Sequence, residues 1–149
     1  KKEWRKDLVK IFAGHNIPYI AQANVYNVMD LYKKAKKALE IEGPKFLNVL
    51  MPCTTNWSFP ENLTMKISRL ATETNFWPLY EIEKGVLTVN VKPKDRKPIE
   101  EFLKLQTRFK HLFTEDNKKY IEEIQKKIDE DFENLLKLEK VTHEEGVRI

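Results

Sequence analysis

The pattern of apolar and polar positions predicts that helices and strands alternate over the first half of the chain. The first helical face, at spacing i, i+4, i+7, i+8, consists of Trp4, Leu8, Ile11 and Phe12. It predicts a helix of about three turns, which Gly14 would end with a left-handed cap. Residues 17–21 then have the composition of a short strand.

A second helical pattern follows the loop at residues 24–27. Asn27 is a plausible N-cap, and Asp30 stands three positions later. The predicted apolar face consists of Val28, Leu31, Tyr32, Ala35, Ala38 and Leu39, and the solvated face carries Lys33, Lys34, Lys36 and Lys37. Gly43 closes this helix.

Residues 45–57 are the stretch around which the rest of the chain is organised. A mostly apolar run at 46–51 lies between Gly43-Pro44 and Pro52, which predicts a buried strand. Directly after it comes Cys53, the single cysteine, in a short polar loop that ends at Trp57. The loops at the carboxyl ends of strands carry the chemistry in α/β sheets, so Cys53 is the first candidate for a functional residue.

The middle of the chain changes from helical to strand periodicity. Pro60 suits the first position of a third helix, whose stripe is Leu63, Ile67, Leu70 and Ala71. Alternation of period two on either side of Lys84-Gly85 predicts a β-hairpin over about 78–91. The charged run at 92–97 then indicates a linker.

Two further helices complete the pattern. Pro98 would open one helix, with Ile99, Phe102, Leu103 and Phe109 facing inward. The last helix would begin near Thr114 and run to about Val141, with a stripe made of Ile121, Ile124, Ile128, Phe132 and Leu135. The tail at 142–149 is expected to be loosely held.

This order predicts an α/β fold with few parallel strands flanked by helices, followed by a β-hairpin and a helical C-terminal arm. We divide it into an α/β domain at residues 1–92, hairpin included, and an arm at 93–149. Two parallel strands make a poor sheet by themselves, and the first residue is Lys rather than Met. Both observations lead us to expect a chain that is trimmed, processed or a piece of something longer.

Composition narrows the possible functions. The 149 residues carry a net charge of +4 from 27 cations interleaved with 23 anions, which gives little support to a nucleic-acid partner. One cysteine cannot form an internal disulfide, and no run of 18 apolar residues occurs. We therefore expect a cytoplasmic protein with no membrane partner.

The residues alone identify no complete active site. A single cysteine is more often a small buried hydrophobic residue than a nucleophile or a ligand. The three histidines, His15, His111 and His143, stand in no recognisable relation to Cys53. No glycine-rich phosphate loop occurs, because the four glycines lie far apart. We assign no catalytic residue and no cofactor-binding residue within this chain.

Six segments in register resemble a known family. They are residues 17–23, 37–44, 49–57, 67–74, 77–82 and 97–111. Together they resemble the C-terminal half of the β subunit of pyruvate:ferredoxin oxidoreductase and its 2-oxoacid relatives, from about residue 8 to residue 112. The last helix is similar only in character. The fold implied is part of a thiamine-pyrophosphate-binding-type domain.

The resemblance implies an enzyme that oxidatively decarboxylates a 2-oxoacid, pyruvate first among them, to acyl-CoA and CO2. Its cofactors would be thiamine pyrophosphate, Mg and a 4Fe-4S cluster, and its electrons would pass to ferredoxin. Cys53, in the Pro-Cys loop, would be one of four cluster ligands. The three other cysteines and the diphosphate-binding segment belong to the N-terminal half of the family's β subunit. This chain alone is therefore expected to bind no cofactor and to be inactive.

The implied partners are the N-terminal half of the β subunit, the α and other subunits, and ferredoxin. An alternative is a non-catalytic interaction module that uses the long C-terminal helix, through which the chain could also form a dimer. An exposed apolar stripe at Ile121, Ile124 and Ile128 together with a buried Cys53 would favour that alternative. An accessible Cys53 at the end of a strand would favour the oxidoreductase.

Overall fold

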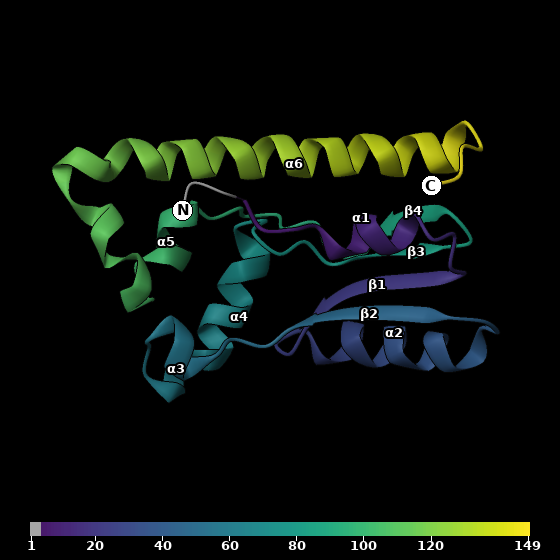
Figure 1. Ribbon diagram of the computed structural model, residues 1–149, viewed down its shortest axis with the longest axis horizontal. Coiled ribbons are helices and arrows are strands. Elements are labelled where there is room, and N and C mark those ends of the chain that lie inside the picture. The colour runs from purple at the N-terminus through teal and green to yellow at the C-terminus, as the bar shows by residue number, and fades with distance from the viewer. Residues whose placement is uncertain (1–3) are drawn as a thin grey trace.

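A four-stranded mixed sheet in the order β2-β1-β3-β4 forms the middle layer of the molecule (Figure 1). The computed structural model describes residues 4–149, so residues 1–3 of the first predicted domain lie outside the described part. The parallel pair is β1 (Tyr19–Asn24) and β2 (Lys45–Leu50). The hairpin strands β3 (Tyr80–Glu83) and β4 (Val86–Val89) add to β1 in antiparallel fashion. The α/β class and the hairpin are confirmed.

The helices lie on both sides of this sheet. They are α1 (Leu8–Ala13), α2 (Val28–Glu40), α3 (Thr54–Trp57), α4 (Thr64–Glu73), α5 (Ile99–Leu103) and α6 (Lys118–Glu144). Short 3-10 helices lie between these elements: η1 (Glu61–Leu63), η2 (Thr107–Phe113) and η3 (Glu115–Asn117). Figure 1 shows α6 running the length of one side, above α1 and the hairpin, while α2 lies on the opposite side. No described helix is long and apolar enough to cross a membrane.

The hairpin turn has the backbone that its sequence predicts. Lys84 has a φ of 48° and Gly85 a φ of 79°. Positive φ at both central residues belongs to the two-residue turn whose twist matches that of the flanking strands. Glycine adopts a positive φ without steric cost, whereas Lys84 adopts it with some strain. The turn therefore needs glycine at only one of its two central positions.

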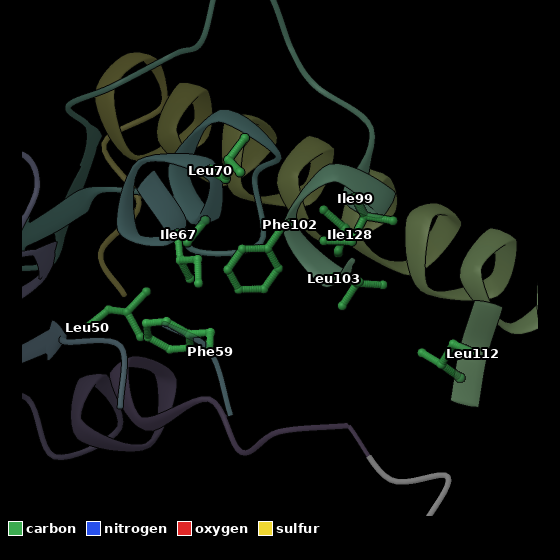
Figure 2. Packing of buried hydrophobic residues seen from close by; sticks show 10 residues of the cluster. Leu50, Phe59, Ile67, Leu70, Ile99, Phe102, Leu103, Leu112 and Ile128 are labelled. Atoms are coloured by element: carbon green, nitrogen blue, oxygen red, sulfur yellow. The ribbon is translucent and has the colours of Figure 1, made fainter. Parts of the chain in front are cut away.

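Three hydrophobic clusters of described residues hold the layers together; a small one joins Tyr19 and Ala21 of β1 to Ala38 of α2, and the other two are larger. The α4–α5 cluster consists of Leu50, Phe59, Ile67, Leu70, Ala71, Ile99, Phe102, Leu103, Leu112 and Ile128. Figure 2 shows Phe102 between Ile67 of α4 and Ile128 of α6. The sheet cluster consists of Val9, Ala13, Ile20, Tyr80, Ile82, Leu87, Val89 and Leu135. Because Ile128 and Leu135 both belong to α6, this helix contributes to both of the larger clusters.

The stripe predicted for the last helix is confirmed, and its partners lie within the chain. Ile128 is 2% and Leu135 7% exposed. Ile121 and Ile124 are partly buried against the α4–α5 cluster, and Phe132 against the sheet cluster. The exposed stripe that would favour an interaction module is therefore not present. The helix begins at Lys118 and ends at Glu144, later than predicted at both ends, because Glu115 and Asp116 form a 3-10 turn before it.

The first predicted helix is wrong in extent and in its buried face. It has six residues and begins after Asp7, whose side chain accepts a hydrogen bond from the Lys10 amide. Val9 and Ala13 are buried, whereas Leu8 and Ile11 are exposed. Gly14 is right-handed at φ −61°, and the left-handed residue is Asn16.

The predicted face of the second helix is right for Ala38, which is buried, and wrong for its exposed members. Its N-cap position at Asn27 is confirmed, but its buried residues are Lys34 and Ala38. Leu39 is 86% exposed, and Val28 is exposed as well. The physical reason is that the Lys34 ammonium donates 2.8 Å to the Gln22 carbonyl oxygen and 2.7 Å to Asp30 Oδ2. These bonds let a lysine occupy a buried position on the sheet side of α2.

Smaller corrections concern strands and caps. The first strand begins at Tyr19 rather than residue 17, after Pro18. The second strand is at the edge of the sheet and partly exposed, not fully buried, because its pairing in the described chain is with β1 alone. Pro60 and Pro98 stand one residue before their helical turns, at the N-cap.

The C-terminal tail is held at both ends, contrary to the prediction, although residues 143–148 between them are exposed. Thr142 is 2% exposed and belongs to α6. The Ile149 amide donates 3.1 Å to the Gly85 carbonyl, and the Ile149 side chain packs against the sheet cluster. The tail thus covers the hairpin turn, a contact that involves positions too far apart in sequence for periodicity to indicate.

Candidate functional site

Cys53 lies just beyond the carboxyl end of β2, in the loop that sequence analysis singled out. Because β1 and β2 are parallel, the loops that follow both strands leave the same edge of the sheet. The Val25 amide donates 3.2 Å to the Leu50 carbonyl, which ties the two loops together. Cys53 is exposed. Its accessible position at a strand end is the one we expected.

The backbone around the thiol is a single helical turn. Cys53 is the N-cap of α3, with φ −94° and ψ 111°. Its Sγ accepts a hydrogen bond from the Asn56 amide at 3.4 Å, and its carbonyl accepts one from Trp57 at 3.0 Å. Pro52 is buried on one side of the cysteine. The sulfur therefore has one backbone donor and one open side toward solvent.

The end of this turn is fixed to the rest of the molecule. Ser58 takes a left-handed conformation at φ 53°, which reverses the chain so that the Phe59 amide reaches the Thr54 carbonyl at 3.2 Å. Phe59 enters the α4–α5 cluster. The Thr107 amide donates 3.0 Å to the Ser58 carbonyl, so η2 of the arm holds the Cys53 loop directly.

Trp57 and Arg108 make the second contact between this loop and the arm. The Arg108 guanidinium lies 4.1 Å above the Trp57 ring and 4.5 Å from the Phe109 ring. Its Nε and Nη2 donate to Gln106 Oε1 at 3.0 and 2.7 Å. Burial lowers the pKa of Arg108 to about 10, so the guanidinium remains charged at neutral pH. Sequence analysis missed this residue, because no local pattern marks an arginine that stacks on a tryptophan about fifty positions away.

A buried amide holds the neighbouring loop. Asn24 Nδ2 donates 3.1 Å to the Ser68 carbonyl and 2.7 Å to Thr72 Oγ1. Its Oδ1 accepts from the Asn27 amide at 2.9 Å. Asn24 is fully buried, so these bonds fix the carboxyl end of β1 against α4. The polar composition of residues 24–27 was visible in the sequence, but the burial of Asn24 was not.

The other candidate ligands do not gather with Cys53. Within residues 4–149, no group of three or more His, Cys, Asp or Glu side chains could hold a metal ion. His143 bonds to the hairpin, with its Nε2 at 2.9 Å from the Leu87 carbonyl oxygen and 3.2 Å from Thr88 Oγ1. This places His143 with the sheet cluster rather than with the Cys53 loop.

Comparison with known proteins finds curated relatives that match most of this chain. No family model matches the chain. The pyruvate synthase subunit PorB of Methanocaldococcus jannaschii is 52% identical over 126 residues, which are 85% of this chain and 41% of that subunit. PorB of Thermotoga maritima is 44% identical over 149 residues, 99% of this chain and 46% of that subunit. The ketoisovalerate oxidoreductase subunit VorB of Pyrococcus abyssi is 43% identical over 143 residues, 95% of this chain and 45% of that subunit.

Over the length that it matches, this chain is similar to the PorB and VorB subunits. It spans less than half the length of these curated relatives, and it corresponds to their C-terminal part. The resemblance stated from the six segments is therefore confirmed, and it extends beyond residue 112 into the last helix, since the match to PorB of Thermotoga maritima takes in 99% of this chain. The relatives' names describe subunits of a pyruvate synthase and of a ketoisovalerate oxidoreductase.

In this chain the structure brings together residues that no single motif contains. The Cys53 loop comes from the α/β part, and Thr107 and Arg108 come from the arm. The residue predicted from the sequence, Cys53, is where it was expected. The residues that hold its loop, Asn24, Trp57 and Arg108, emerge only from the three-dimensional arrangement.

Proposed function

We propose that this chain forms part of the β subunit of a 2-oxoacid:ferredoxin oxidoreductase. The complete enzyme would oxidatively decarboxylate a 2-oxoacid to acyl-CoA and CO2 and pass the electrons to ferredoxin. The names of the relatives support the substrate class, since they include pyruvate synthase and ketoisovalerate oxidoreductase. Pyruvate is the first candidate because the two most similar relatives described above carry its name.

The observation that carries the proposal is the exposed Cys53 in its Pro-Cys loop. The donor chemistry fits an iron–sulfur ligand, because a thiolate is the group that holds such clusters. The Asn56 amide directed at Sγ also fits, since hydrogen bonds to ligand sulfur stabilise its negative charge. Cys53 would be one of four ligands of a 4Fe-4S cluster, which when bound supplies one-electron transfer. The three other thiolates would come from the remainder of the subunit.

The same proposal covers the other cofactors and partners. Thiamine pyrophosphate and Mg would be bound in the complete enzyme by the part of the β subunit that this chain does not include. The remaining part of the β subunit, the α and other subunits, and ferredoxin would be the partners. We place the enzyme in the cytoplasm, in keeping with the single unpaired cysteine.

Substitution of Cys53 in the complete enzyme tests the proposal. Cys53→Ala should remove the cluster that this residue helps to hold, about four iron atoms per β subunit, because three thiolates do not replace four. Iron analysis and low-temperature electron paramagnetic resonance of the reduced enzyme measure the loss. Oxidation of the 2-oxoacid with ferredoxin as acceptor should fall to background.

Thr55→Ala is the matched control for this experiment. Thr55 lies two residues away in the same turn and is exposed. Its substitution should leave the iron content and the spectrum of the enzyme unchanged. An intact four-iron spectrum in the Cys53→Ala enzyme would show that Cys53 is not a ligand.

A further inference from the structure

Arg108 presents a half-buried positive charge that lacks an anionic partner in the described part of the chain. Its guanidinium donates to a neutral amide, Gln106 Oε1, and stacks on Trp57 and Phe109. Within residues 4–149 no carboxylate forms an ion pair with it. Removing a charge from water without a counter-charge is unfavourable, so such a group fits best where an anion arrives from elsewhere.

The position of this charge is fixed relative to Cys53 by two contacts. Trp57 ends the single turn that Cys53 begins, and the Trp57 amide bonds to the Cys53 carbonyl. The guanidinium stacks on the indole of this same Trp57. The residue before Arg108, Thr107, donates its amide to the Ser58 carbonyl at 3.0 Å. Arg108 and the Cys53 loop therefore form one packed unit, although 54 intervening residues separate them in sequence.

Gln106 determines which way the guanidinium points. It is 1% exposed, and its Nε2 donates 2.8 Å to the Phe102 carbonyl within the α4–α5 cluster. Its Oε1 is thereby free to accept both Nε and Nη2 of Arg108. These two hydrogen bonds fix the orientation of the guanidinium. Its Nη1 has no hydrogen-bond partner among the described residues.

We propose that the positive charge of Arg108 stabilises the reduced form of the cluster held by Cys53. This inference rests on the proposed function. A 4Fe-4S cluster with four thiolate ligands is an anion, and each one-electron reduction makes it more negative by one charge. A fixed cation beside the ligand loop lowers the free energy of the reduced form more than that of the oxidised form. The reduction potential is therefore raised by Arg108.

Two substitutions separate the charge of Arg108 from its packing. Arg108→Gln removes the charge and keeps a polar side chain of moderate length. Arg108→Lys keeps the charge but loses the planar fork that bonds to Gln106 and stacks on Trp57. If the charge acts, the glutamine variant changes the cluster and the lysine variant retains most of the original behaviour.

The measurement is a redox titration of the complete enzyme, followed by the electron paramagnetic resonance signal of the cluster. We expect Arg108→Gln to keep its iron and to titrate at a lower midpoint potential than the unmodified enzyme. Arg108→Lys should titrate closer to the unmodified enzyme. Lys126→Gln, which removes an exposed charge from α6, is the control and should leave the midpoint potential unchanged.

Three results would overturn the inference. They are an unchanged midpoint potential in Arg108→Gln, an equal shift in Lys126→Gln, and loss of the cluster from both Arg108 variants, which would assign the residue a role in packing alone. Loss of the cluster from the glutamine variant but not the lysine variant would support the requirement for charge. Each of these results is compatible with a cluster ligated by Cys53, so the proposed function fails only in the separate Cys53→Ala experiment.

Discussion

At the scale of single residues, buried polar side chains determine which way α2 faces. Tyr19 donates 2.5 Å to Glu81 Oε2, and Lys37 bonds to Glu81 Oε1 at 2.7 Å and to Glu83 Oε2 at 3.1 Å. Burial raises the pKa of Glu81, but the hydrogen bonds from Lys37 and Tyr19 outweigh it and hold that pKa below its ordinary value. An ionised Glu81 therefore stabilises the contact between α2 and β3.

The first prediction concerns Glu81→Gln in the 149-residue chain. Near neutral pH we expect a free energy of unfolding lower by about 1–2 kcal/mol, a modest value because Lys37 is 37% exposed and partly screened by solvent. The folded-state pKa of Glu81 is lowered, so its contribution is complete above the ordinary carboxyl pKa and is lost as pH falls through the folded value. The difference between the two proteins should therefore shrink in acid.

Urea unfolding at a series of pH values from about 7 to about 3 measures this difference. Glu42→Gln, at an exposed carboxyl in the loop after α2, should give curves that coincide with the unmodified chain. A deficit in Glu81→Gln that stays constant down to the lowest pH would contradict an ionic role for Glu81.

Single residues also show where sequence reasoning ends. Cys53 could be placed at a strand end because a bounded apolar run followed by a polar loop has few other interpretations. The burial of Lys34 could not be predicted. Its apolar stem can lie against the sheet only where a carbonyl oxygen is within hydrogen-bond distance of the ammonium group. That carbonyl, on Gln22, belongs to a different element. The same limitation applies to Arg108.

At the scale of elements, α6 protects the outer edge of the sheet. The Leu87 amide of β4 donates 3.2 Å to Thr142 Oγ1, and the Val89 amide donates 2.8 Å to Glu139 Oε1. Side chains of a helix thus satisfy backbone donors that a further strand would otherwise satisfy. An exposed strand edge can pair with a strand of another chain. Because α6 covers this edge, β4 pairs with β3 alone among the described strands.

The second prediction tests this edge with Thr142→Val. Valine keeps the shape of threonine but leaves the Leu87 amide without an acceptor, so the free energy of unfolding should fall by about 1–3 kcal/mol. The Leu87 amide should also exchange with deuterium faster than in the unmodified chain. Chemical unfolding and hydrogen exchange followed by nuclear magnetic resonance provide the two measurements.

Lys140→Ala is the control for Thr142→Val, because Lys140 is on the solvent side of the same turn. It should change stability by less than about 0.5 kcal/mol. Unchanged exchange at Leu87 in Thr142→Val would mean that the helix covers the edge without bonding to it.

Elements were predictable where local chemistry alone decides them. The hairpin followed from period-two alternation around Lys84-Gly85, and the stripe of α6 from its heptad-like spacing. Pairing of β4 with α6 was not predictable, since it depends on Glu139 and Thr142 meeting amides about fifty residues earlier. For the same reason the tail was wrongly expected to be loose.

At the scale of the whole molecule, the arm and the α/β part share one hydrophobic cluster. The α4–α5 cluster takes Leu50, Ile67 and Leu70 from before residue 92 and Ile99, Phe102 and Ile128 from after it. The division at residues 92 and 93 stays a prediction about organisation along the chain. The shared cluster leads us to expect that the two sides unfold together, and that the Cys53 loop depends on both.

Phe102→Ala tests this dependence. Phe102 is completely buried, with its ring 6.2 Å from that of Trp57 and 4.7 Å from that of Phe76. Loss of this ring should lower the free energy of unfolding by about 3–5 kcal/mol through lost burial and a residual cavity. Because α6 packs in both of the larger clusters, tryptophan fluorescence and far-ultraviolet circular dichroism should shift to the same lower urea midpoint.

Leu39→Ala removes a leucine that is 86% exposed, so it should leave both transitions within about 0.5 kcal/mol of the unmodified chain. If the fluorescence transition moved to a lower urea concentration while the circular-dichroism transition stayed unchanged, the region around the Cys53 loop would unfold by itself. In that case α6 would not couple the two larger clusters, and the contact from Phe102 through Trp57 to the Cys53 turn would be a local one. Coincident transitions would instead make the arm a structural requirement for the geometry around Cys53.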